Sequence, residues 1–203
     1  MSFYRICSSY LNKILNICFM INQEISKIIK SRKSIYPKDF NEKKIDKKTI
    51  IEILENANHA PTHKMTQPWF FKVFSGKSKQ KLLKEITSQN QEMTSMAKEK
   101  LNFNFEKTSH IICVCMNRNQ GLLPEWEEIA ATAMAVQNIW LSCVNVDIGG
   151  YWSTPKFTST IKDFLSLSNT QRCLGFFYLG RHDFVNKRNV KRKNIEEETE
   201  WFV

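Results

Sequence analysis

One short polar loop holds the densest set of chemically useful side chains in this 203-residue chain. It reads APTHKMTQPWFF over residues 60–71 and lies between a periodic helical stretch and an apolar strand. Pro61 and Pro68 exclude regular structure across it. His59 and His63 have the four-residue spacing of zinc ligands, but Pro61 ends any helix they could share and no third ligand is near in the sequence. We therefore expect no metal site.

A second candidate site is the segment GGYWSTP, residues 149–155. The chain has six glycines, and four of them lie within about thirty residues at 149, 150, 175 and 180. Clustered glycine indicates tight backbone, either at a turn or against a ligand. The segment matches neither the Rossmann nor the P-loop pattern. A glycine-bearing strand end with two aromatic rings suits a flat heterocycle, although a simple turn would also explain it.

Two basic clusters could bind a phosphate. SRKS at 31–34 joins two cations to two hydroxyl groups, and KRNVKRK at 187–193 adds five cations. Each cluster alone is explained by a solvated surface; together with the aromatic turn they indicate a phosphorylated flat cofactor. The formal net charge of +10 permits an acidic partner, but the lysines are scattered and form no basic stripe interleaved with aromatic residues.

Covalent catalysis has little support in the sequence. No GxSxG motif is present, and the paired carboxylates stand at a helix start and in the tail. The six cysteines show no CxxC spacing, and Cys113 and Cys115 would share one face of a strand. Buried free thiols in a reducing cytoplasm are the natural interpretation.

The predicted elements make one α+β, three-layer domain. Helices are expected at 22–31, at 46–59 with Asp46 as N-cap and a buried stripe of Ile50, Ile51, Leu54 and Ala57, at 77–99, and from Pro124 onward. Strands are expected at 69–75, 110–116, 147–152 and 173–180, with a short helix before the last. Residues 129–146 carry no charge, but their polar residues favour burial in a core or subunit interface over a membrane span.

Residues 1–19 form an amphipathic, acid-poor extension. It is a candidate targeting peptide, an extra helix or the product of a misassigned start, and we favour the last two. The domain proper is expected at 20–203.

Six segments in order resemble the nitroreductase family of flavin-dependent oxidoreductases, specifically its short members with an HKxxQPW loop. They are RKS at 32–34, the loop at 60–71, EEIAATAMAVQNIWL at 127–141, GGYWSTP, LGFFYLG at 174–180 and KRKNIEEETEW at 191–201. The resemblance implies an α+β fold with a central, mostly antiparallel sheet flanked by helices. It also implies an intertwined homodimer with FMN at the subunit interface.

The resemblance also implies which residues contact FMN. Arg32, Lys33 and Ser34 would hold the phosphate and ribityl chain, and Lys191 and Lys193, with Arg192 as a substitute for either, would complete the phosphate site. The residues that would contact the flavin ring are His59, His63, Lys64 and Gln67 of the loop and Tyr151, Trp152 and Ser153 of the turn. Two positions depart from the family: Met65 replaces an asparagine, and Asn194 replaces a proline.

The implied reaction passes hydride from NADH or NADPH through FMN to a nitroaromatic, a quinone or a similar small acceptor. The cofactor carries the chemistry, so no side-chain acid or base is obligatory and a ping-pong cycle is expected. Neither nucleic acid nor a membrane is an expected partner, and a cytoplasmic location is expected. The alternatives are a basic, noncatalytic protein that binds nucleic acid or a membrane surface, and a flavoprotein of the same fold with another reaction.

Overall fold

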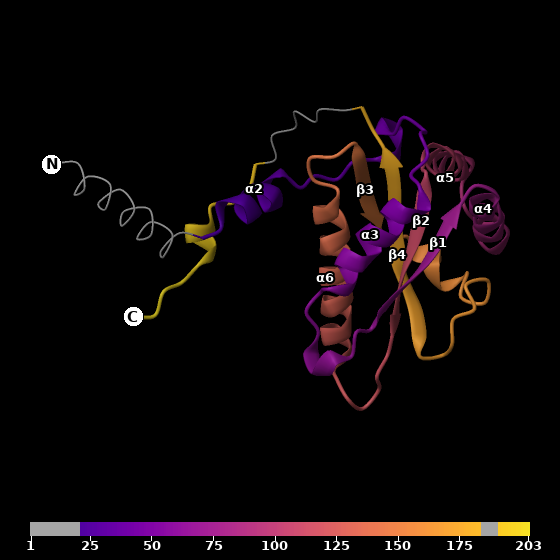
Figure 1. The fold of residues 1–203 in the computed structure, drawn as a ribbon. Helices are drawn as coiled ribbons and strands as arrows, with labels where there is room; N and C mark the ends of the chain where they lie inside the picture. Colours follow the sequence, from indigo (N-terminus) through magenta and orange to yellow (C-terminus); the bar gives the residue numbers. More distant parts are fainter. Residues whose placement is uncertain (1–20, 184–190) are drawn as a thin grey trace.

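Four antiparallel strands form the sheet at the centre of the protein. The computed structural model describes residues 21–183 and 191–203 (Figure 1). The strand order is β1-β2-β4-β3. Each neighbouring pair runs antiparallel, as expected. The strands are β1 (Trp69–Ser75), β2 (His110–Asn117), β3 (Ile148–Ser153) and β4 (Gln171–Arg181).

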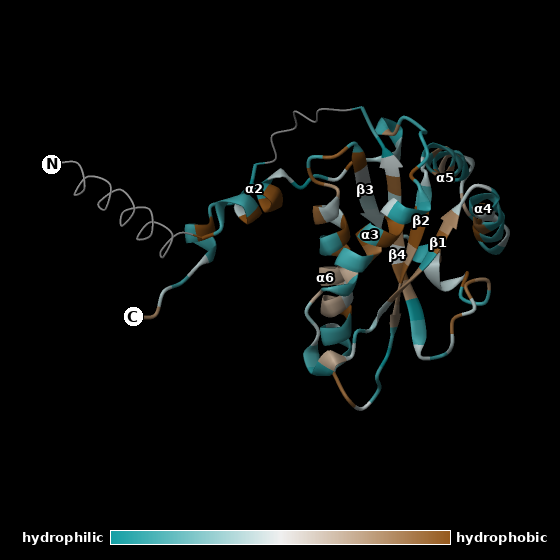
Figure 2. Cartoon of the chain, viewed as in Figure 1, coloured by the Kyte–Doolittle hydropathy of each residue, from teal (hydrophilic) through white to brown (hydrophobic). Residues whose placement is uncertain are grey.

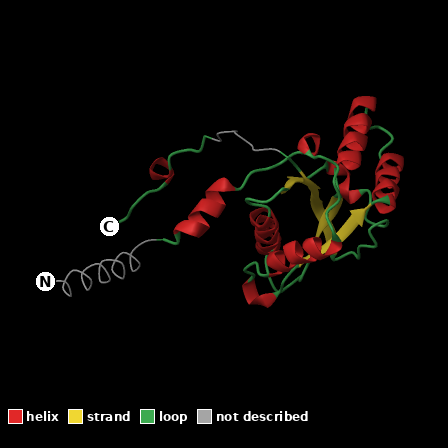
Figure 3. Ribbon diagram, turned by 45° about the horizontal axis from the view of Figure 1, so that its top comes forward, coloured by secondary structure: helices red, strands yellow, loops and turns green. Residues whose placement is uncertain are grey.

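Helices cover both faces of this sheet (Figure 3). Alternate residues of β2 divide between two cores: Ile111, Cys113 and Cys115 belong to one, and Ile112 and Val114 to the other. The three-layer α+β prediction is confirmed. The first core includes residues of α4 (Lys77–Gln89) and α5 (Ser95–Lys107). The second core includes residues of α3 (Lys47–Asn58) and α6 (Glu125–Ser142). Four short 3-10 turns complete the elements: η1 (Pro37–Asp39), η2 (His63–Met65), η3 (Lys156–Ser159) and η4 (Ile195–Glu198).

Two details of the predicted helices were wrong. The single helix expected at 77–99 is two helices, because buried Asn90 ends α4 and the Thr94 hydroxyl accepts a hydrogen bond from the Ala97 amide to begin α5. In α3, Asp46 is the N-cap as predicted, but Ile51 is exposed and Ile53 is buried. The inward stripe is therefore rotated relative to the prediction.

Helix α6, which is uncharged from Ile129 onward, is buried along one face, which includes Ala131, Ala135 and Ile139. Its other face exposes Trp126 and Met134. Within residues 21–183 and 191–203, no helix is both long and apolar enough to cross a membrane. Within a single chain, the burial predicted for this segment is therefore confirmed for one face of α6 and not for the other.

The glycine cluster accommodates protein side chains. Gly149 and Gly180 face each other across β3 and β4. A Cβ atom on Gly149 would lie 2.5 Å from the Ile35 side chain, and one on Gly180 would lie 2.5 Å from the Phe40 ring. The segment after the SRKS cluster can therefore pack directly on the strand backbone. Close packing of side chains is thus a third cause of tight backbone, beside the turn and the ligand contact that the sequence suggested.

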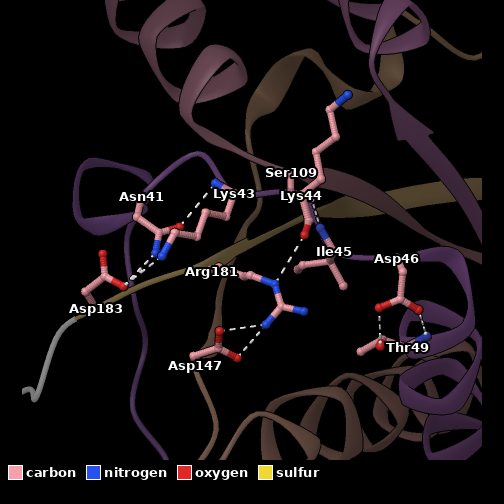
Figure 4. Close-up of polar contacts among 10 residues, drawn as sticks. All are labelled: Asn41, Lys43, Lys44, Ile45, Asp46, Thr49, Ser109, Asp147, Arg181 and Asp183. Carbon is pink, nitrogen blue, oxygen red and sulfur yellow. Dashed lines mark hydrogen bonds and ion pairs between the residues drawn. The ribbon is translucent and has the colours of Figure 1, made fainter.

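A polar network holds the continuation of this segment against the end of β4 (Figure 4). The Arg181 guanidinium donates to both carboxylate oxygens of Asp147, at 2.7 and 2.6 Å, and to the Lys44 carbonyl. The Asn41 side-chain amide donates to the Asp183 carboxylate at 2.8 Å. Because Asp147 directly precedes β3, the network fixes the start of the glycine-bearing strand.

Two segments project away from the layers on the same side of the molecule (Figure 1). They are α2 (Gln23–Ser31), none of whose residues is buried, and the tail from residue 191 onward. Both nevertheless carry large apolar residues, and part of α2 has the colour of hydrophobic residues in Figure 2. The exposed ones are Ile21, Ile25, Ile28, Ile29, Ile195, Trp201, Phe202 and Val203.

Candidate functional site

Arg32 lies at the C-terminal end of α2 and connects the first basic cluster to the body of the protein. Its guanidinium carbon is 5.1 Å from the centroid of the Trp140 ring on α6, a cation–π contact. The Trp140 indole N–H donates to the Gly150 carbonyl at 2.9 Å, and the Ile35 amide donates to the same oxygen at 3.1 Å. The cluster is thus held beside the edge strand β3, and Lys33 and Ser34 are half-buried in this link.

The described part of the second basic cluster, residues 191–193, approaches the first through Arg192. Burial lowers the pKa of Arg32, and the positive charge of Arg192 lowers it further, so the two guanidinium groups repel each other. Within the described residues, no carboxylate forms an ion pair with either arginine. Lys193 pairs with Glu198 at 2.7 Å, and Lys191 is exposed. Two arginines from distant parts of the sequence therefore converge without a neutralising acid.

The aromatic turn lies next to this basic end. Tyr151 and Tyr36 have ring centroids 4.7 Å apart, and Ser153 is half-buried at the end of β3. The Trp152 indole N–H is buried and has no hydrogen-bond partner among the described residues. A Cβ atom on Gly175 would lie 2.8 Å from this nitrogen, so glycine is required there for the indole to fit. The turn thus contains one buried donor that none of the described residues satisfies.

The polar loop at residues 60–71 is fixed at the other end of α6. His63 Nδ1 lies 2.5 Å from a carboxylate oxygen of Glu127, in the first turn of α6. Lys64, Met65 and Gln67 adopt positive φ angles of 50°, 52° and 42°. Such strained backbone in non-glycine residues is concentrated at functional sites. Lys64 and Gln67 are exposed, so their polar groups remain available.

Trp69 anchors the far side of this loop. It is buried, and its indole N–H donates to the Asn58 side chain at 3.2 Å. His59, at the C-cap of α3, is exposed and lies 3.7 Å from Glu55 on the same helix. Among the residues the structure describes, no group of three or more His, Cys, Asp or Glu side chains could hold a metal ion.

The predicted site residues therefore form two groups within one chain. Arg32 and the β3 turn lie near Trp140, whereas His63 and Lys64 lie near Glu127. Thirteen residues of α6 separate Trp140 from Glu127, which is about 20 Å along the helix axis. Sequence reasoning missed Glu127 and Trp140. Nothing in the helix pattern distinguishes Glu127 from its acidic neighbours, and Trp140 stands within an apolar run.

We expect the replacement of Glu127 by alanine to loosen the polar loop. The pair with His63 is partly exposed, so its loss should cost about 0.5–1 kcal/mol, equivalent to an increase of about two- to fivefold in local opening. Hydrogen exchange of the amides at 62–67 measures this. The control is Glu55→Ala, which removes the His59 pair within α3 and should leave exchange in the loop unchanged. Equal exchange in both variants would contradict the anchoring role.

Comparisons with known proteins identify the class to which this fold and site belong. Residues 29–181 match the profile described as the nitroreductase family. The chain therefore belongs to the nitroreductase family of oxidoreductases, as the six sequence segments predicted.

Individual relatives agree with this assignment. The Bacillus subtilis protein named "Putative NAD(P)H nitroreductase YfhC" is 27% identical over 181 residues, which are 84% of this chain and 92% of that protein. YdjA of Escherichia coli K12, which carries the same description, is 25% identical over 134 residues, 63% of this chain and 73% of YdjA.

Solved structures show the same fold. A nitroreductase-like family protein from Bacillus cereus superposes with a TM-score of 0.79 at 26% identity, covering 91% of this chain and 98% of that one. The FMN-dependent nitroreductase NfnB from Mycobacterium smegmatis, solved in complex with NADPH, gives a TM-score of 0.71 at 17% identity, covering 89% and 99%. At 17% identity the latter supports the fold alone.

Proposed function

We propose that this protein is an FMN-dependent oxidoreductase that passes hydride from NADH or NADPH to a small acceptor such as a nitroaromatic or a quinone. The observation that carries the proposal is the convergence of Arg32 and Arg192 beside the aromatic turn of β3, two cations with no paired carboxylate among the described residues. Membership of the nitroreductase family supports it, and so do relatives named as NAD(P)H nitroreductases.

The residues present fit a phosphorylated flavin. An anion between Arg32 and Arg192 would relieve the repulsion that lowers the pKa of Arg32, and guanidinium groups are well suited to phosphate. Lys33, Ser34, Lys191 and Lys193 are near these two in the sequence and could add donors. The unsatisfied indole N–H of Trp152 and the rings of Tyr36 and Tyr151 offer polar and aromatic contacts nearby.

We propose that FMN lies at the interface of a homodimer. The phosphate-binding arginines and the polar loop are about 20 Å apart along α6 in one chain. A site in which the arginines of one chain face His59, His63, Lys64 and Gln67 of the other would bring both groups to one cofactor. The exposed isoleucines of α2 and the apolar tail support this arrangement, because a second copy could cover them.

When bound, FMN supplies the hydride-accepting and hydride-donating centre. The chain's own residues bind and orient it. Arg32 and Arg192 would hold the phosphate, and Lys64 and His63 would supply positive charge and hydrogen-bond donors to the ring. Glu127 keeps His63 in place through the 2.5 Å contact. No side chain needs to donate or remove a proton from the acceptor, so we propose that the nicotinamide and the acceptor occupy one site in turn.

The proposed alternation predicts ping-pong initial-rate kinetics, and a pattern that requires a ternary complex would contradict it. A cytoplasmic location belongs to the same proposal, because the four described cysteines are all free.

The first test is the visible absorption spectrum of protein purified without added flavin, recorded again after anaerobic addition of NADH or NADPH. Oxidised-flavin bands that bleach with either nicotinamide are expected. Colourless protein that also fails to bind added FMN would contradict the proposal and favour a basic, noncatalytic binding protein. In that case, binding to nucleic acid or to anionic vesicles should fall steeply with salt.

A further inference from the structure

Three cysteines converge on one face of the sheet, in the core against which Tyr151 also packs. Cys113 and Cys115 are on β2 and Cys173 is on β4, and all three belong to the core on the α4 and α5 side. The Cys113 and Cys115 thiols both act on the pKa of Cys173, and the Cys173 thiol donates a hydrogen bond to the Gly175 carbonyl at 3.4 Å. The sequence placed only the two β2 thiols on a shared face, because the pairing of β2 with β4 is a long-range contact.

Cys115 and Cys173 stand directly opposite each other in the antiparallel ladder, next to a bulge after Val114. Directly opposed residues have Cα atoms about 4.5–5.5 Å apart, which falls within the range of about 4.4–6.8 Å found in disulfides. The pairing therefore places the two residues where a cross-strand disulfide could form.

Cys173 is also the member of the cluster that a small molecule can approach. It lines a cavity of about 310 Å³ whose other walls come from the turn after β3 and from the start of β4. Cys113 and Cys115 are fully buried, whereas Cys173 retains 8% exposure. The lining residues are Thr158, Ser159, Lys162, Leu167, Gln171, Arg172, Cys173 and Leu174.

The surroundings favour Cys173 as the nucleophile. Hydrogen bonds from the Cys113 and Cys115 thiols lower the pKa of Cys173, while the pKa values of Cys113 and Cys115 are raised. By contrast, burial raises the pKa of Cys143, at the end of α6, to about 12. The thiolate is the reactive form of cysteine, so Cys173 should react ahead of Cys143.

We infer that Cys173 is a peroxide-reactive cysteine and that Cys115 resolves its oxidised form to a cross-strand disulfide. In the first step, the Cys173 thiolate attacks one oxygen of a hydroperoxide, the O–O bond breaks, and an alcohol or water leaves after taking a proton from solvent. In the second step, the Cys115 sulfur attacks the sulfenic acid, the S–S bond forms, and hydroxide leaves as water with the Cys115 proton. Two thiols are oxidised and one hydroperoxide is reduced.

The test uses the full-length protein, purified with reductant, exchanged into reductant-free buffer and treated with hydrogen peroxide without NADH or NADPH. Thiols that remain are alkylated after denaturation, and peptides are mapped by mass spectrometry. A Cys115–Cys173 cross-link that dithiothreitol reverses is expected. Because no nicotinamide or acceptor is present, the result is independent of the proposed flavin chemistry.

Variants separate the roles of the three cysteines. Cys173→Ser should abolish the cross-link, and Cys115→Ser should leave a sulfenic acid on Cys173 that dimedone traps. Cys113→Ser should still form the cross-link. The matched control is Cys143→Ser, which should react as the wild type does. Ser159→Trp, which adds a ring to the cavity wall, should slow oxidation of Cys173 several-fold.

Three results would overturn the inference. One is that Cys113, Cys115 and Cys173 are alkylated as fully after peroxide treatment as before it. Another is that Cys143 is oxidised before Cys173. The third is a cross-link from Cys173 to Cys7 or Cys18, which lie outside the described residues, in place of Cys115. Because the wild-type experiment alone can give each of these results, the test does not depend on any variant folding.

Discussion

Replacing Arg32 by alanine is expected to weaken FMN binding by about 10- to 100-fold, the largest effect we expect from any single proposed contact. A hydrogen bond to a charged group contributes about 1.5–3 kcal/mol, and each 1.4 kcal/mol is tenfold in Kd. The Kd of Arg32→Lys for FMN should fall between those of the wild type and Arg32→Ala, because lysine keeps the charge but loses the guanidinium fork. Titration of flavin-free protein with FMN, followed by quenching of flavin fluorescence, measures all three proteins.

The matched control is Lys30→Ala, which removes an exposed cation two residues earlier, in the last turn of α2. It should change the Kd for FMN by less than about twofold, because a surface charge that touches no ligand contributes little. If Arg32→Ala and Lys30→Ala bind FMN equally well, Arg32 does not hold the phosphate. The same titration at higher salt should weaken wild-type binding more than that of Arg32→Ala.

Much of the fold could be predicted because it depends on local patterns. Asp46 caps α3 through the Thr49 amide, as a short acceptor before an apolar helix should. The alternation in β2 assigned Cys113 and Cys115 to one face, and the structure buries both there. Ser75 and Gly76 end β1 where the sequence changes from aromatic to polar. Each of these features involves residues within about four positions of one another.

The features that could not be predicted depend on distant contacts. Positions 149 and 180 require glycine because Ile35 and Phe40 pack against them, and no local sequence pattern pairs these residues. The division between α4 and α5 follows from Asn90, whose side chain also hydrogen-bonds Thr160, 70 residues away. The separation of Arg32 from His63 likewise follows from the packing of both segments on α6, so a site shared by two chains was suggested by family resemblance and not by spacing.

The largest stability effect is expected at Arg118, where β2 ends. Glu128, in α6, is fully buried and accepts a hydrogen bond from the Arg118 guanidinium at 2.5 Å. Its other carboxylate oxygen accepts from the amide and the side chain of Asn119, at 2.9 and 2.7 Å. Arg118→Ala would leave this carboxylate buried without its cation, and breaking such a pair costs about 3–5 kcal/mol in free energy of unfolding.

Arg172→Ala provides the control, because it removes a guanidinium that pairs at 2.9 Å with Glu125 in the same first turn of α6, but with both side chains about half exposed. It should cost at most about 1 kcal/mol. Urea unfolding at equal flavin saturation measures the free energy of unfolding of both variants. Similar losses in the two would contradict the prediction that burial of Glu128 makes the Arg118 pair the more important one. The double variant Arg118→Met with Glu128→Leu should recover part of the loss, because it removes both charges. Recovery should be incomplete, because Asn119 would lose the carboxylate oxygen that accepts its two hydrogen bonds.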